Sequence, residues 1–204
     1  MSKGGFMKDA VILFVITLIA GVCLGGVYTI TKEPIAKAQQ EAKEAAYRVV
    51  FPGDYKFSSS DEITAAIPAA NEALAGMGYG NVLVSEAVEV VDGSGASVGS
   101  VVSATSKDGF GGAVSISVGI DLDGTVKGIE FLSLSETPGL GMNATKPAFK
   151  DQFSNKKAES FTVTKSGAAS DSEIDAMSGA TITSNAVTNA VNAAVYFADN
   201  CMAQ

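Results

Sequence analysis

The chain of 204 residues contains no histidine and no tryptophan. Without histidine it cannot form a Ser-His-Asp or Cys-His catalytic site, and it lacks the commonest protein ligand of transition metals. The two cysteines, Cys23 and Cys201, are too few and too far apart in sequence to build a metal cluster. Cys23 also lies within an apolar run, which disfavours a disulfide between the two. We therefore expect no metal site.

Basic residues are scarce as well. Lysine and arginine number 14 against 22 aspartates and glutamates, which gives a formal net charge of -8. The sequence has no run of basic residues, and aromatic residues make up only 7% of it. Proteins that bind nucleic acids need a positive surface, so we expect no nucleic-acid partner. The acidic balance is typical of a soluble domain and does not indicate a substrate.

One long apolar segment is present near the N-terminus. Residues from Ala10 to Ile30 carry no charge, and a helix needs about 20 such residues to cross the hydrocarbon core of a membrane. We predict a short tail over residues 1–9 and a transmembrane helix over residues 10–31. A cleaved signal peptide is the alternative, but its apolar region would be unusually long. Two lysines precede the run and four basic residues follow it, so the positive-inside rule does not favour an exported domain. Long domains can cross the membrane regardless of such charges, so the rule carries little weight here.

The rest of the sequence predicts a domain with both helices and strands. Pro34 suits the first turn of a connecting helix over residues 32–52, and the remaining domain covers residues 53–204. Valine-rich stretches with alternating polarity predict strands joined by short turns, hence antiparallel pairing. The fold class is therefore α+β, an antiparallel sheet flanked by helices. The expected strands and helices cover residues 61–77, 82–91, 97–104, 113–120, 125–134 and 184–201.

Two segments of this domain could carry chemistry. The first is Ser178-Gly179-Ala180-Thr181, which places a threonine hydroxyl and small residues at the entrance of the last helix. The hydroxyl could simply cap the helix. The same position could also hold a phosphate, because the N-terminus of a helix offers unpaired N–H groups and the positive end of the helix dipole. The two interpretations are compatible.

The second segment follows a predicted strand and reads Glu136-Thr137-Pro138-Gly139-Leu140-Gly141. Its proline and two glycines predict a tight loop with exposed backbone N–H groups. Such donors can bind the carbonyl-rich edge of a flavin, and glycines let a flat ring approach closely. Composition alone favours an ordinary corner between a strand and a loop.

Together with Gly109-Phe110-Gly111-Gly112 and Val118-Gly119-Ile120-Asp121, these two segments occur in the order seen in the FMN-binding domain family, which the chain resembles. Within that family it is similar to the G subunit of the Rnf ion-translocating electron transport complexes. The C subunit of the sodium-translocating NADH:quinone reductase is also similar but is usually longer. The resemblance covers nearly the whole chain, including the apolar N-terminal segment.

The resemblance implies that FMN is joined to Thr181 through a phosphoester bond. A separate flavin transferase makes this bond in the family, so the chain is the substrate of that enzyme and is not catalytic alone. Asp175 matches the acidic start of the transferase recognition motif, and residues 178–180 match its core of small residues. The loop over residues 136–141 is expected to lie beside the isoalloxazine ring.

The resemblance also implies a place in the cell. It predicts a single-pass protein of the cell membrane with its domain on the extracytoplasmic side. This subunit would pass electrons between other membrane and peripheral subunits of a ferredoxin:NAD oxidoreductase that moves sodium ions or protons. Two alternatives remain: the flavin subunit of a related complex, such as the NADH:quinone reductase, or an anchored scaffold domain without redox activity. The sequence identifies neither the ion nor the immediate electron donor and acceptor.

Overall fold

The computed structural model describes residues 3–202 of the chain. The chain divides into two compact units, Met1–Ala42 and Lys43–Gln204. Helix α1, Lys3–Val50, is a single helix that continues from the first unit into the second and contains Pro34. The predicted transmembrane and connecting segments therefore belong to one helix.

The apolar part of α1 exposes large hydrophobic side chains. The stretch Met7–Val50 has a window with a mean hydropathy of 2.7, and none of that window is buried in the protein. Its threonines satisfy their own hydroxyl groups within the helix. Thr17 Oγ1 donates to the carbonyl of Leu13 at 3.0 Å, and Thr29 Oγ1 donates to the carbonyl of Gly25 at 2.9 Å. Such internal bonds suit a helix surrounded by apolar material, where no water replaces them.

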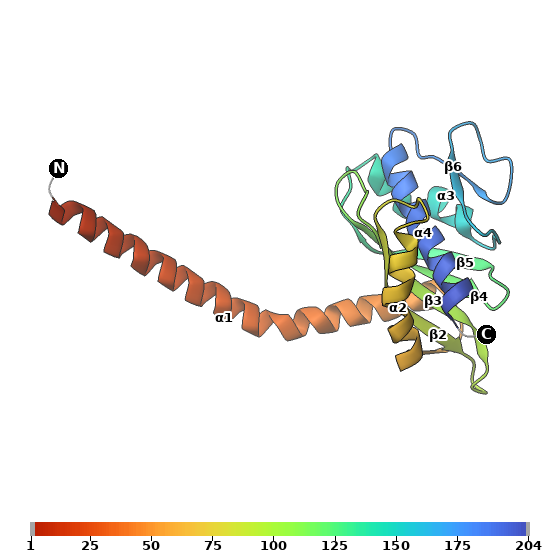
Figure 1. Cartoon of the computed structure of the whole chain (residues 1–204), viewed down its shortest axis with the longest axis horizontal. Helices are drawn as coiled ribbons and strands as arrows, with labels where there is room; N and C mark the ends of the chain where they lie inside the picture. Colours follow the sequence, from red (N-terminus) through yellow and green to blue (C-terminus); the bar gives the residue numbers. More distant parts are fainter. Residues whose placement is uncertain (1–2, 203–204) are drawn as a thin grey trace. The chain divides into compact units, whose positions relative to one another are not determined.

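The second unit is built on a five-stranded sheet with the order β1-β2-β3-β4-β5. Figure 1 labels its strands β2 to β5. Every neighbouring pair is antiparallel, and this confirms the α+β fold class. The strand predicted over residues 82–91 is confirmed without change, and the next three differ from their predicted bounds by one or two residues. The strands are β1 Lys56–Ser58, β2 Val82–Val91, β3 Ser97–Ser106, β4 Val114–Asp121 and β5 Val126–Leu134.

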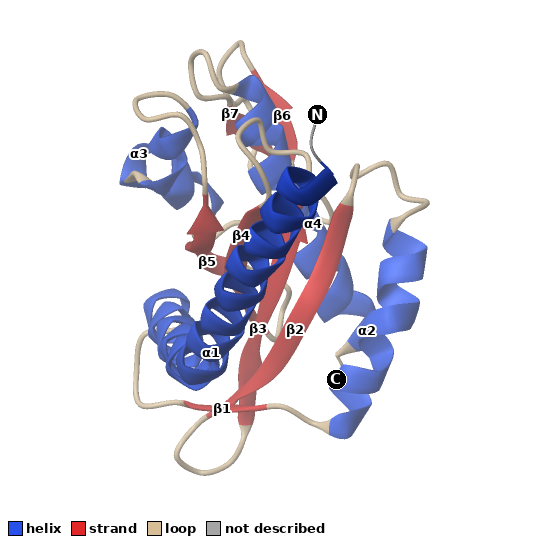
Figure 2. Cartoon of the chain, turned by 90° about the vertical axis from the view of Figure 1, so that its left-hand side faces the viewer, coloured by secondary structure: helices blue, strands red, loops and turns tan. Residues whose placement is uncertain are grey.

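Two helices, α2 (Asp61–Leu74) and α4 (Thr181–Cys201), cover one face of this sheet. Figure 2 shows α2 running beside β2. The predicted alternation along β4 is confirmed on this face, where its apolar side chains are at most 1% exposed and meet the apolar stripe of α4. This core contains Val114, Ile116, Val118 and Ile120 from the strand and Val187, Val191 and Val195 from the helix.

The opposite face of the sheet is covered by the end of α1 that belongs to the second unit. Tyr47, Val50 and Phe51 pack there against apolar side chains of β2 and β3. The contact is close at β4, where a Cβ added to Gly119 would lie 2.8 Å from the carbonyl oxygen of Val50. This cover explains why Gly119, Ser103 and Ser117 are buried on this face of the sheet.

Short elements fill the chain between β5 and α4. They are η1 (Gly141–Thr145), α3 (Pro147–Lys150), η2 (Asp151–Phe153) and the parallel pair β6 (Thr162–Thr164) and β7 (Glu173–Asp175). Asn192 of α4 ties this region to the core. Its side-chain amide accepts from the backbone N–H of Phe161 at 2.7 Å and donates to the carbonyl of Phe161 at 2.9 Å. The sequence predicted none of these elements.

Candidate functional site

Helix α4 begins at Thr181, three residues before the predicted start at residue 184. The N-cap residue is Ala180, whose backbone is not helical and whose side chain makes no capping bond. The prediction that a threonine hydroxyl caps the helix is therefore wrong for Thr181. Ser184 instead makes two hydrogen bonds at the helix entrance, neither of which caps a free N–H of the first turn. Its hydroxyl accepts from the N–H of Met177 at 3.0 Å and donates to the carbonyl of Ala180 at 2.9 Å.

The first turn of α4 leaves backbone donors without partners. The N–H of Ser184 bonds to the carbonyl of Ala180 at 2.9 Å, which is the first bond of the helix. Within residues 3–202, no acceptor is found for the N–H groups of Thr181, Ile182 and Thr183. Unpaired N–H groups at a helix start, together with the helix dipole, favour an anion.

The loop after β5 lies next to this helix start. Its backbone folds on itself, because the N–H groups of Leu140 and Met142 both donate to the carbonyl of Thr137, at 3.1 and 3.2 Å. These two donors are thus not available to a ligand. Glu136, which is only 9% exposed, accepts from the N–H of Phe110 at 2.8 Å. That bond joins the loop to the glycine-rich segment around Phe110, which lies 26 residues earlier in the sequence.

Gly141 and Gly179 permit the close approach of the loop to α4. A Cβ at Gly141 would lie 2.8 Å from Thr183 Oγ1 and 2.7 Å from Glu136 Oε2, so no larger residue fits without displacing its neighbours. Gly179 has a φ of +72°, in the left-handed region that side chains disfavour. The two segments singled out from the sequence are therefore brought together, although about 40 residues separate them.

A cavity of about 340 Å³ opens between them. Seven of the ten residues predicted to bind the cofactor line it, while Pro138, Gly139 and Ser178 do not. Its walls are mainly apolar, and Glu136 is the one ionisable residue in the lining. The predicted residues in the lining are Glu136, Thr137, Leu140, Gly141, Gly179, Ala180 and Thr181.

Three further residues that were not among the predicted site residues line the cavity: Phe110, Ile182 and Thr183. Phe110 is 70% exposed, which is unusual for a large aromatic side chain. The sequence held one signal for it, an aromatic residue placed among three glycines. Its nearness to the loop over residues 136–141 depends on the tertiary bond to Glu136 and could not be read from spacing.

Asp175 lies outside this cavity, at the end of β7. Its carboxylate accepts from the N–H of Ala168 at 2.7 Å, and its own N–H donates to the side chain of Gln152, also at 2.7 Å. The side chain is exposed, so it remains accessible from solution.

Comparison with known proteins places these features in a family. Residues 109–196 match the FMN-binding domain family, and residues 1–50 match the RnfG N-terminal region. The G subunit of the proton-translocating ferredoxin:NAD(+) oxidoreductase complex of Clostridium ljungdahlii is 50% identical over 95 residues, which cover 47% of this chain and 50% of that one. The G subunit of the Na(+)-translocating complex of Acetobacterium woodii is 32% identical over 197 residues, 95% of this chain and 91% of the relative.

Two solved structures are similar over part of the chain. NqrC of Shewanella oneidensis aligns with a TM-score of 0.45 at 26% identity, covering 54% of this chain and 55% of that one. The C subunit of the Na(+)-translocating NADH-quinone reductase of Parabacteroides distasonis aligns with a TM-score of 0.48 at 25% identity, covering 58% and 63%. Because the sequence similarity to the Acetobacterium protein extends over nearly the full length of both chains, this protein belongs to the RnfG family, the G subunits of the ion-translocating ferredoxin:NAD oxidoreductase (Rnf) complexes, and contains an FMN-binding domain.

Proposed function

We propose that this subunit is a membrane-anchored electron carrier whose FMN is linked to the hydroxyl of Thr181 through a phosphoester bond. The observation that supports this most directly is the position of Thr181, at the start of α4 and in the wall of the cavity. The bond would be made by a flavin transferase. The chain would then act as a carrier within the complex and not as an enzyme alone.

The exposure of the nearby hydroxyl groups favours Thr181 over its neighbours. Thr183 is 1% exposed and Ser184 is fully buried, with its hydroxyl engaged in two hydrogen bonds. Thr181 is partly exposed, so a transferase and its flavin substrate can reach it. Asp175, which matches the start of the transferase motif, is exposed six residues earlier and remains the proposed recognition residue.

The residues around Thr181 fit a flavin phosphate. No lysine or arginine lines the cavity, so the negative charge would be stabilised by the free N–H groups of Thr181, Ile182 and Thr183 and by the dipole of α4. With 21 residues, α4 is long enough to have a full helix dipole. The small residues Gly179 and Ala180 leave space beside the phosphate.

The remainder of the cavity fits a flat aromatic ring. Phe110, Leu140 and Ile182 provide exposed apolar surface, and binding would remove much of it from water. A volume of about 340 Å³ lies within the range of ligand pockets, about 300–1,000 Å³. The bound flavin would supply one- and two-electron transfer. The protein would orient the ring, exclude water from it and place the buried carboxylate of Glu136 at one end of the site.

We propose that α1 anchors the domain in the cell membrane and that the domain faces the extracytoplasmic side. The exposed apolar stretch of α1 and the match of residues 1–50 to the RnfG N-terminal region support the anchor. The side of the membrane rests on the family resemblance alone. A covalent link suits that side, because a flavin that dissociates outside the cytoplasm is lost. The span from Ala10 to Ile30 holds no charged residue and so offers no path for an ion.

The covalent link can be tested with residues 35–204 produced with and without a flavin transferase. We expect the intact mass to rise by one FMN group only with the transferase, and the denatured band to fluoresce under ultraviolet light. Thr181→Ala should abolish both signals, while Thr183→Ala, a control at the neighbouring threonine, should keep them. A protein that stays colourless in every case would favour the scaffold alternative, and covalent flavin on Thr181→Ala would refute the assignment.

A further inference from the structure

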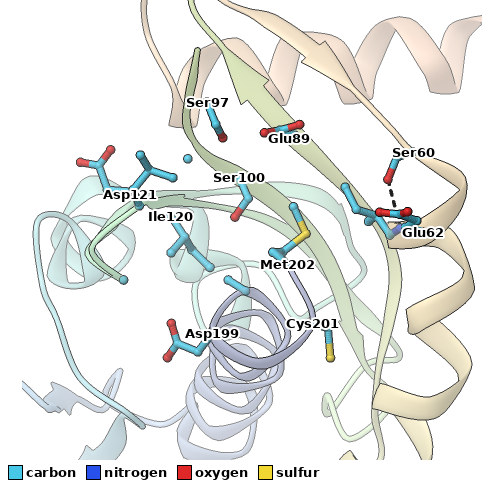
Figure 3. Close-up of a pocket in the computed structure, with 15 residues that line it drawn as sticks. Ser60, Glu62, Glu89, Ser97, Ser100, Ile120, Asp121, Asp199, Cys201 and Met202 are labelled. Atoms are coloured by element: carbon cyan, nitrogen blue, oxygen red, sulfur yellow. Dashed lines mark hydrogen bonds between the residues drawn. The ribbon is translucent and has the colours of Figure 1, made fainter. Parts of the chain in front are cut away.

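A second cavity lies at the opposite end of α4 from Thr181. Figure 3 shows the residues that line it. It has a volume of about 290 Å³ and is bounded by the end of α4, the start of α2 and the sheet strands β2, β3 and β4. No residue of this cavity lines the candidate flavin site. Its chemistry is therefore independent of the proposed flavin.

The lining is acidic and contains no basic residue. Four carboxylates contribute to it, from Glu62, Glu89, Asp121 and Asp199. Asp121 forms an ion pair with Lys127 at 3.2 Å, whereas Glu62 and Glu89 have no ion pair among residues 3–202. Partial burial raises the pKa of Asp199, although the charge of Lys157 opposes that shift. The cavity thus concentrates negative charge that the protein only partly neutralises.

An unpaired hydroxyl group points into the same space. Ser100 is 6% exposed, and no hydrogen bond of its hydroxyl is found within the described part of the chain. Figure 3 shows this hydroxyl directed between Ile120 and Met202. Other buried hydroxyls of these strands are paired; Ser103 bonds to Ser117 at 3.1 Å. A ligand that donates a hydrogen bond would give the Ser100 hydroxyl a partner within the cavity.

The ends of the two helices add to the negative potential. The last turn of α4 has no basic residue, and the C-terminal end of a helix carries partial negative charge on its free carbonyl groups. The start of α2 has the opposite polarity. However, Asp61 and Glu62 in its first turn offset that charge, and Ser60 already accepts from the N–H of Ile63 at 3.1 Å. The potential in the cavity therefore favours a cation.

The geometry favours an organic cation over a metal ion. Among residues 3–202, no group of three or more acidic or cysteine side chains lies close enough to hold a metal. Ile63, Ile120 and Met202 give the cavity apolar walls that suit a hydrocarbon chain. We propose that this cavity binds an alkylammonium group, with Ser100 and Glu89, which are partners across β2 and β3, receiving its N–H donors. The group would belong either to a free diamine or to a lysine side chain of a partner subunit.

The test is a calorimetric titration of the full-length chain in detergent with 1,5-diaminopentane. We expect saturable binding with one site per chain. Glu89→Gln and Ser100→Ala should each raise the Kd about tenfold, because each removes a hydrogen bond to a charged group. Ser100→Ala leaves the net charge unchanged, so its effect separates a built site from general attraction. The matched control is Glu72→Gln, which removes one exposed carboxylate from α2 outside the cavity and should leave Kd within twofold.

Two results would overturn the proposal. One is the absence of saturable binding. The other is a loss of affinity in Glu72→Gln as large as in Glu89→Gln, which would indicate diffuse electrostatic attraction. The same titration of the assembled complex distinguishes the two sources of the cation. Binding that is retained there identifies a free diamine, whereas binding that is blocked in the complex and restored on dissociation identifies a lysine side chain of a partner.

Discussion

Replacing Gly141 with alanine should separate the loop over residues 136–141 from the start of α4. The added Cβ would lie 2.7 Å from Glu136 Oε2 and 2.8 Å from both Glu136 Cβ and Thr183 Oγ1. The carboxylate could rotate away at little cost, but the Cβ of Glu136 moves only with its backbone. Thr183 is buried at 1% exposure and is fixed in α4. Because the clash cannot relax locally, we expect a loss of about 1–3 kcal/mol in the free energy of unfolding.

The assay is urea unfolding of residues 35–204 followed by circular dichroism, together with the absorbance spectrum of the flavin-loaded protein. The control is Gly93→Ala, at a position where an added Cβ has no neighbour within 4 Å, and it should change stability by less than about 0.5 kcal/mol. The Gly141→Ala variant should also shift the flavin absorbance, because the loop forms one wall of the cavity. Equal stability of the two variants and an unchanged spectrum would refute the close contact.

Two further predictions concern stability. Asn192→Ala should lower the free energy of unfolding in urea by about 2–5 kcal/mol, because it leaves the buried N–H and carbonyl of Phe161 without partners. The control Asn189→Ala, on the same helix, should lower it by less than about 0.5 kcal/mol. Equal losses in the two variants would contradict this role of Asn192. Burial, reinforced by Glu86, raises the pKa of Tyr47 from 10.0 to about 12, so the folded state holds this proton more tightly than the unfolded state. That stabilisation is complete below pH 10. The free energy of unfolding should then fall by about 2–3 kcal/mol as the pH rises to about 12. In parallel alkaline titrations, the Tyr47→Phe variant should not show this loss. An identical pH dependence in that variant would show that other groups are responsible.

The central sheet could be predicted because the local sequence patterns of its strands and turns agree with the fold. Valine and alternating polarity specify β2 and β4, and the turn over residues 121–124 pairs β4 with β5 as its residues suggest. The parallel pair β6 and β7 could not be predicted. Each strand has three residues, and their pairing depends on contacts with distant segments.

The start of α4 was misplaced because Thr181, Ile182 and Thr183 are poor helix formers and show no clear periodicity. Their helical state depends on Ser184, whose hydroxyl holds Met177 and Ala180 at the helix entrance. Tertiary contacts therefore outweigh local helix propensity at the position where the proposed site lies.

The residues of the candidate site were predicted only where a motif marks them. Gly141 and Thr181 belong to such motifs, and the structure places both in the wall of one cavity. Phe110 joins them through the bond between its N–H and Glu136, a contact between distant segments that no spacing rule reveals. The acidic cavity at the far end of α4 could not be predicted at all, because its residues come from five elements and form no motif.

The most direct test of the central claim is the position of the flavin in the chain isolated from its complex. Lys165 is the last basic residue, so trypsin releases residues 166–204 as one peptide that contains Thr181, Thr183 and Ser184. Fragmentation of this peptide in a mass spectrometer would locate the added FMN mass to a single residue. We predict that the mass is carried by Thr181. A flavin located on Thr183 or Ser184, or a peptide that carries none, would contradict the proposed attachment.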